Sequence, residues 1–180
     1  TRLQGDWSSD VCSSDLDKII TPYFMEDKNK LLCIAYSMNL IKLLTVEGQQ
    51  NINVFELIKN LKVLLEDDKW LIKFIFWELS LYKSVGYDIE FKDYVDKETL
   101  NNGEEKYYVK STNKFVPNFL INKNYNIDNA NDVLNGFKIV GDYLEKTILK
   151  TIGINYPNSR LEFFNSIKNL DLSDLQNMKQ

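Results

Sequence analysis

The sequence contains no histidine. Without imidazole groups the chain has no Ser–His–Asp or Cys–His catalytic set, no histidine general base and no histidine metal ligand. Two cysteines are too few for a four-cysteine zinc site or a disulfide framework. Glycine-rich phosphate loops and carboxylate motifs with metal-binding spacing are also missing. We therefore expect a protein that is not an enzyme and that holds no metal or cofactor.

Long apolar runs and an excess of basic residues are missing as well. No run reaches the roughly 18 residues of a membrane span, and no signal-peptide pattern is present. The net charge of −4 disfavours a protein that binds nucleic acid over its whole surface. Because 44% of the 180 residues are hydrophobic, the chain can bury one core, and we expect a soluble cytoplasmic domain.

The first sixteen residues differ in composition from the rest. Residues 17–180 contain 20 Lys, 20 Asn and 16 Ile, whereas residues 1–16 contain none of the three. The same short segment holds Arg2, Cys12 and a near-repeat, SSD-VC-SSD. We interpret residues 1–16 as a foreign, disordered leader similar to a translated sequencing adaptor, with a genuine Ser/Asp-rich tail as the alternative.

Most of the remaining sequence has helical periodicity. Residues 28–46 are apolar on most sides, which predicts a central helix. Asp67 and Asp68 are placed to cap a later helix and Gly86 to end it, while residues 171–180 are expected to fray. The predicted helices are residues 28–46, 54–66, 68–85 and 130–152, followed by a short helix opened by Pro157.

The helical period disappears between Tyr87 and about Asn126. Within this stretch Tyr107–Val109 and Phe115–Ile121 are predicted to be extended, with a turn at Asn101–Asn102–Gly103. The prediction is a mainly α fold, in which a helical bundle carries a short irregular or β insertion between its third and fourth long helices.

Two residues of the helix predicted at 68–85 lie on unexpected faces. Glu78 lies in the middle of the apolar face, where an unpaired carboxylate is costly, so we predict a structural buried carboxylate. Its partners would be backbone N–H groups, Arg160 or a lysine, and a catalytic role is the less favoured alternative. Phe76 lies within the polar stripe beside Ile72 and Leu79. Either the irregular segment covers this ring or the ring is offered to a partner.

Four motifs in order resemble the DNA repair protein family RecO. Residues 76–87, FWELSLYKSVGY, resemble its aromatic-Glu-Leu-x-Leu-Leu-x-x-x-Gly-Tyr motif. Tyr107–Ser111 is similar to a strand of the alphaproteobacterial branch, and Phe137–Lys150 to the long helix that follows it. Pro157 with Arg160-Leu161 is similar to the short last helix. The resemblance identifies residues 17–180 as a RecO-like helical C-terminal domain.

The resemblance implies a mediator of recombinational DNA repair. RecO proteins join an N-terminal OB fold, which makes much of the contact with single-stranded DNA, to a helical C-terminal domain. Nothing before Asp17 can form that barrel, so we expect the chain to lack it. Family members work with RecR, bind the acidic, apolar tail of single-stranded DNA-binding protein (SSB), anneal strands and help to load RecA. These activities imply a cytoplasmic protein associated with the nucleoid.

Docking an acidic, apolar tail requires an apolar pocket with a cation on its rim. Relatives often carry arginine at the position of Phe76, so the cation here would be Lys73 or Lys83. Some relatives hold zinc with four cysteines after the Gly-Tyr pair, but residues 92–110 contain none and no zinc is expected. The predicted partner-binding residues are Ile72, Lys73, Phe76, Leu79 and Lys83.

Two other functions remain open. One is an unrelated helical interaction or regulatory domain, for which an amphipathic bundle is sufficient. The other is direct binding of single-stranded nucleic acid, in which lysines neutralise phosphates and tyrosines stack on bases, although Glu104 and Glu105 weaken this signal. The residues that would contact nucleic acid are Lys106, Tyr108, Lys110 and Lys114.

Overall fold

The computed structural model describes residues 20–46, 50–101, 103–125, 127 and 130–168. The predicted leader at 1–16 and the predicted frayed end at 171–180 lie outside the described residues. The elements are a short 3₁₀ helix at Thr21–Phe24, α2 at Lys28–Leu44, α3 at Ile52–Glu66, α4 at Trp70–Ser84, α5 at Phe91–Tyr94, β1 at Val95–Thr99, β2 at Glu105–Val109, β3 at Phe115–Val116, α6 at Asn118–Asn122, α7 at Ala130–Tyr143, a π-helical segment at Leu144–Leu149, α8 at Lys150–Ile152 and α9 at Asn158–Lys168.

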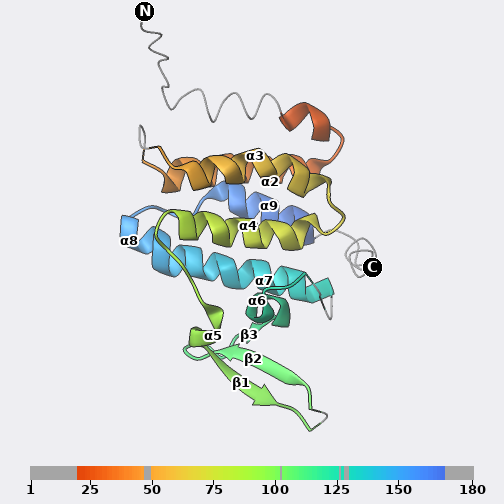
Figure 1. Cartoon of the computed structure of the whole chain (residues 1–180), viewed down its shortest axis with the longest axis vertical. Coiled ribbons are helices and arrows are strands. Elements are labelled where there is room, and N and C mark those ends of the chain that lie inside the picture. Colours follow the sequence, from red (N-terminus) through yellow and green to blue (C-terminus); the bar gives the residue numbers. More distant parts are fainter. Residues whose placement is uncertain (1–19, 47–49, 102, 126, 128–129, 169–180) are drawn as a thin grey trace, which may run out of the picture.

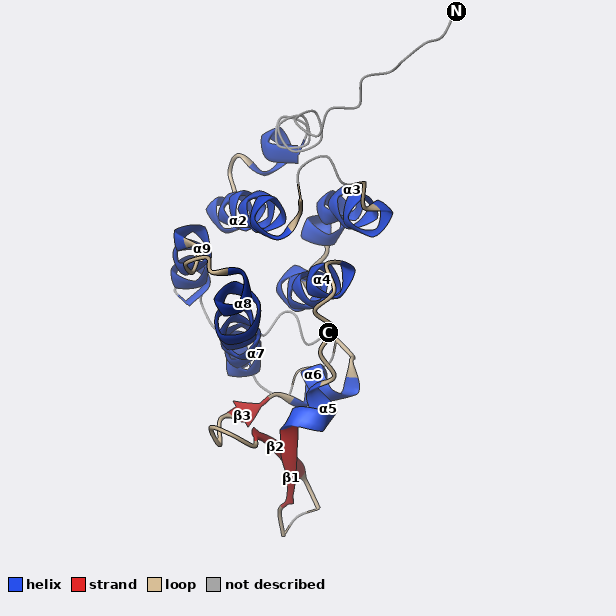
Figure 2. Ribbon diagram, turned by 90° about the vertical axis from the view of Figure 1, so that its left-hand side faces the viewer, coloured by secondary structure: helices blue, strands red, loops and turns tan. Residues whose placement is uncertain are grey.

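The helices form a bundle from which a small sheet extends (Figure 1). The sheet lies between α4 and α7 in the chain and at one end of the molecule in space (Figure 2). The predicted fold class, a mainly α bundle with a short β insertion, is confirmed. The long helix predicted at 130–152 is also confirmed, but its middle is π-helical over Leu144–Leu149, which periodicity does not reveal.

Helix α4 occupies the centre of the bundle, and the prediction of 28–46 as the central helix is wrong. Nine of the fifteen residues of α4 are buried, because α3 packs on one side of it and α7 on another. Phe74 lies fully buried at its middle, with ring centroids 5.3 Å from Trp77 and 5.5 Å from Phe163. Helix α2 instead buries only six of its seventeen residues, on the face that meets α9 and α4.

Helix ends follow local capping chemistry. Asp27 and Asn51 each accept a backbone N–H three residues on, which starts α2 and α3. Helix α4 ends at Ser84, and Gly86 follows its cap residue with a φ of 95°, which glycine adopts without strain. The carboxylate of Asp67 accepts the N–H of Lys69, one residue before α4 begins, so it fixes the preceding turn rather than the first turn of α4.

The insertion is a three-stranded antiparallel sheet in the order β1-β2-β3. Strand β1 has no apolar alternation, since it reads Val-Asp-Lys-Glu-Thr, and its pairing with β2 was not predicted. The predicted extended segment at Phe115–Ile121 is correct only for its first two residues. Pro117 has no N–H to extend the ladder, and its φ of −60° starts α6 instead. The predicted turn is present at Asn101 and Gly103, while Asn102 lies outside the described residues.

Candidate partner-binding surface on helix α4

The apolar side of α4 carries a buried polar cluster around Glu78. The Glu78 carboxylate is fully buried and accepts the Tyr82 hydroxyl at 2.6 Å and the Tyr36 hydroxyl. Arg160 of α9 donates Nε to Oε1 of Glu78 at 3.1 Å and Nη2 to Oε2 at 3.3 Å. The same guanidinium donates to the Phe137 carbonyl at 2.8 Å and the Tyr156 hydroxyl at 2.7 Å. The cluster joins α2, α4, α7 and α9.

Burial sets the protonation states in this cluster. Desolvation raises the pKa values of Tyr36 and Tyr82 well above the ordinary tyrosine value, and the nearby Glu78 charge raises them further. For Arg160, desolvation opposes the charged form, but the Glu78 carboxylate and the surrounding tyrosine hydroxyls together outweigh it, and the pKa of Arg160 is raised. Because the Glu78 and Arg160 side chains are 0% and 3% exposed, no substrate reaches them, and the arrangement suits a structural role.

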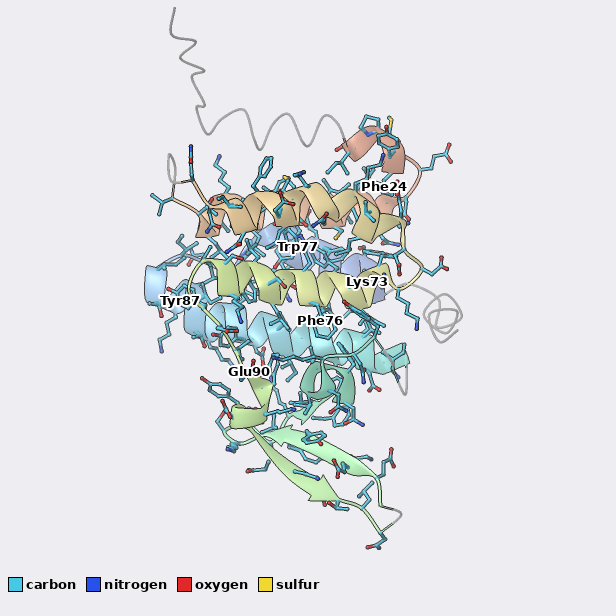
Figure 3. All side chains as sticks on the ribbon, in the orientation of Figure 1. Phe24, Lys73, Phe76, Trp77, Tyr87 and Glu90 are labelled. Atoms are coloured by element: carbon cyan, nitrogen blue, oxygen red, sulfur yellow. The ribbon has the colours of Figure 1, made fainter. Side chains whose placement is uncertain are left out.

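The opposite side of α4 carries Phe76 at the surface of the bundle. Its ring is only partly buried and meets two other rings edge to face, Phe119 of α6 at 6.0 Å and Tyr125 at 5.5 Å. Figure 3 shows Lys73 and Phe76 along the outward side of α4. Residues of the segment predicted to be irregular thus cover Phe76 in part, and a role of the remaining exposed part in binding a partner stays a prediction.

The five predicted partner-binding residues do not all reach the surface. Ile72 is fully buried in the core, and its assignment as a contact residue is wrong. Leu79 is half-buried and packs on the core. We use the name α4 strip for the surface residues that remain: Lys73, Phe76, Leu79 and Lys83.

Both lysines of the α4 strip already have acidic partners. Lys73 pairs with Asp67, and its amine lies 5.7 Å from the centre of the Tyr125 ring. Lys83 pairs with Asp88 at 2.8 Å. Hydrogen bonds within these pairs lower the pKa values of Asp67 and Asp88 and raise that of Lys83. An incoming carboxylate would therefore exchange places with one of these acids.

The residues predicted to contact nucleic acid lie on or beside β2, away from the α4 strip. Lys106 and Tyr108 share the outer face of the sheet with Asp96 and Glu98, which are their direct cross-strand neighbours. Further along, Lys110 donates to the Asp93 carbonyl at 2.9 Å and Lys114 pairs with Asp142. The four residues are near one another, but acidic groups are interleaved with them, so the geometry does not form a basic patch.

Tyr125 lies beside the α4 strip, and sequence reasoning did not identify it. It stands in an Asn-rich stretch with no periodicity, and only the fold brings its ring to Phe76.

Among the described residues there is no group of three or more acidic or cysteine side chains that could hold a metal ion. Within the same part of the chain no helix has the length and apolarity to cross a membrane.

Comparison with known families agrees with the motifs along α4. The sequence model described as "Recombination protein O C terminal" matches residues 25–136, more than half of the chain. The matched range runs from the start of α2 through the sheet and α6 into α7. No curated protein and no solved structure matches the chain. The chain therefore belongs to the family of recombination protein O C-terminal domains, with a role in DNA recombination and repair.

Proposed function

We propose that this chain is a non-enzymatic docking module for repair partners. Its ligand is the acidic, apolar tail of SSB, and through SSB and RecR it supports strand annealing and RecA loading in the cytoplasm at the nucleoid. Contact with single-stranded DNA would come mainly from an OB fold that the described residues do not contain. The family match supports the pathway, and the α4 strip supports the location of the tail.

The observation that carries the proposal is the partly open ring of Phe76 with an amine on each side along the helix. Aromatic rings that are partly desolvated act as anchors for apolar side chains at interfaces. Lys73 and Lys83 lie one helical turn before and two turns after Phe76, so a short tail with alternating acidic and apolar residues meets both kinds of group. Tyr125 extends the apolar surface beside Lys73.

The ion pairs of Lys73 and Lys83 limit the affinity of the α4 strip for the SSB tail. A tail carboxylate at Lys73 must displace Asp67, so part of the electrostatic gain is offset by the pair that is broken. We expect micromolar binding that weakens with added salt, because the charges are near the surface.

The test uses a fluorescently labelled synthetic peptide with the SSB tail sequence and the 180-residue chain, with anisotropy as the readout. Phe76→Ala and Lys73→Glu should each weaken binding by about tenfold or more. The matched control is Lys62→Glu, since Lys62 is also ion-paired and its side chain is 31% exposed, against 32% for Lys73. Equal losses in Lys62→Glu and Lys73→Glu, or no loss in either α4 variant, would contradict the proposed site.

A further inference from the structure

The outer face of α3 carries apolar side chains that no described part of the chain covers. Ile52 is 78% exposed, Val63 is 67% exposed and Phe55 is 45% exposed. Figure 2 shows α3 at the edge of the bundle, with α2 and α4 on its inner side. Ile52 and Phe55 lie one helical turn apart, and a group of exposed apolar side chains rimmed by polar residues is a feature of interaction surfaces.

The exposed residues follow the spacing of a helix–helix contact. Ile52, Glu56, Lys59 and Val63 are separated by four, three and four residues, which keeps them on one stripe of the helix. All four are exposed, whereas the opposite stripe of α3, including Leu61 and Leu65, is buried in the core. The helix thus has two contact stripes, and the described structure uses only one of them.

The outer stripe is complementary to itself in the antiparallel direction. Two α3 helices that cross at the midpoint between Leu57 and Ile58 place Ile52 opposite Val63 of the second copy. The same register places Glu56 opposite Lys59 of the second copy, and the two-fold axis repeats both contacts. In the single chain Glu56 and Lys59 already lie 3.4 Å apart, so the pair of copies assembles two carboxylates and two amines into one alternating cluster.

We propose that two copies of this chain associate through α3, paired antiparallel along the stripe Ile52, Glu56, Lys59 and Val63. Phe55 lies at the flank of this stripe, where its ring is 5.5 Å from the Lys59 amine. A fifteen-residue helix is about 22 Å long, so the contact is small and the dimer is weak and concentration-dependent. This surface is separate from the α4 strip, and the inference does not depend on the proposed function.

The test measures the oligomeric state of the chain by sedimentation equilibrium from 5 to about 500 μM, the range in which small interfaces are expected to dissociate. The wild-type chain should show a reversible monomer–dimer equilibrium. Glu56→Lys places two lysines opposite each other in this register, and Lys59→Glu places two glutamates opposite each other. Each variant should weaken the dimer by about tenfold, since two pairs change sign at once.

Recombining the two substitutions distinguishes the proposed register from a general effect of charge. An equimolar mixture of the Glu56→Lys and Lys59→Glu chains, or one chain with both substitutions, restores opposite charges at every position and should recover wild-type association. Glu162→Lys on the exposed side of α9 is the control that changes the net charge elsewhere. A chain that stays monomeric at the highest concentration, or a mixture that fails to recover association, would overturn the proposal.

Discussion

Gly141 of α7 leaves open the space that the guanidinium of Arg160 occupies. A Cβ atom at position 141 would overlap Nη1 of Arg160 and would lie 2.8 Å from both its Cζ and the Tyr156 hydroxyl oxygen. The missing side chain therefore lets α9 place a cation in the middle of the bundle, where it meets Glu78.

Gly141→Ala should destabilise the fold, although alanine is the better helix former. The helix propensity gain of about 0.5–1 kcal/mol is outweighed by the displacement of a buried guanidinium from hydrogen-bond acceptors on four residues. We expect a net loss of about 2 kcal/mol in urea unfolding. In an Arg160→Lys background the same substitution should cost much less, because no planar guanidinium occupies the site. An equal cost in both backgrounds would show that Gly141 acts independently of Arg160.

Removing one side of the buried ion pair should be more costly than removing either tyrosine hydroxyl. Glu78→Gln leaves a buried cation without its charge partner, and the expected loss is about 3–5 kcal/mol. Tyr82→Phe removes one hydrogen bond and should cost about 1–2 kcal/mol, and Tyr36→Phe, which removes the bond to Glu78 and the one accepted from Arg160, should cost about 2 kcal/mol. Tyr94→Phe, at a tyrosine that is 55% exposed, is the control and should change the free energy of unfolding little. Losses of similar size for Glu78→Gln and Tyr94→Phe would refute a structural role for the carboxylate.

Helix periodicity was sufficient for the main helices because each buries a continuous apolar face. Residues 54–66 and 68–85 were placed within about two residues of α3 and α4. Central position could not be judged in this way. Residues 28–46 contain more apolar residues than one face needs, but burial depends on which neighbours surround a helix, and α4 has neighbours on more sides.

A contact between side chains from distant parts of the sequence was predictable only where a charged side chain lay on an apolar face and therefore needed a polar partner. The position of Glu78 on an apolar face required a partner, and Arg160 was one of the candidates together with backbone N–H groups and the lysines. The burial of Ile72 was not predictable, since a helical wheel does not show which neighbouring elements cover the edge of α4. Strand β1 was missed because an edge strand with charged residues lacks the alternation that marks half-buried strands.

The stability of Phe76 variants reports how far the insertion covers this ring. Phe76 is half-buried and contacts Phe119 and Tyr125, so Phe76→Ala should cost about 1–2 kcal/mol, less than a fully buried phenylalanine. Phe119→Ala is the comparison, because Phe119 is 1% exposed and should cost about 3–5 kcal/mol. Thermal or urea unfolding monitored by circular dichroism measures both. A Phe76→Ala cost equal to that of Phe119→Ala would place Phe76 in the core and leave no open ring for a partner.

Alkaline pH should unfold the protein through its buried tyrosines. Desolvation and the Glu78 charge raise the pKa values of Tyr36 and Tyr82 in the folded state, while the unfolded chain keeps the ordinary value of about 10. Below pH 10 both states hold these protons, so the two tyrosines add no pH dependence. Above that pH the unfolded state releases protons that the folded state retains, and each tyrosine lowers the free energy of unfolding by about 1.4 kcal/mol per pH unit. Urea unfolding from about pH 8 to about pH 11, which spans the ordinary tyrosine pKa, measures how the free energy of unfolding changes with pH.

Ultraviolet titration separates this cause from a general effect of charge. The Tyr36 and Tyr82 phenols should ionise only together with the loss of helical circular dichroism, because both are fully buried. In the Tyr36→Phe, Tyr82→Phe double variant the alkaline slope should become shallower even though the starting stability is lower. If all ten tyrosines ionised in one step while the helices remained intact, the phenols of Tyr36 and Tyr82 would be accessible to solvent, and the buried cluster around Glu78 would not hold in solution.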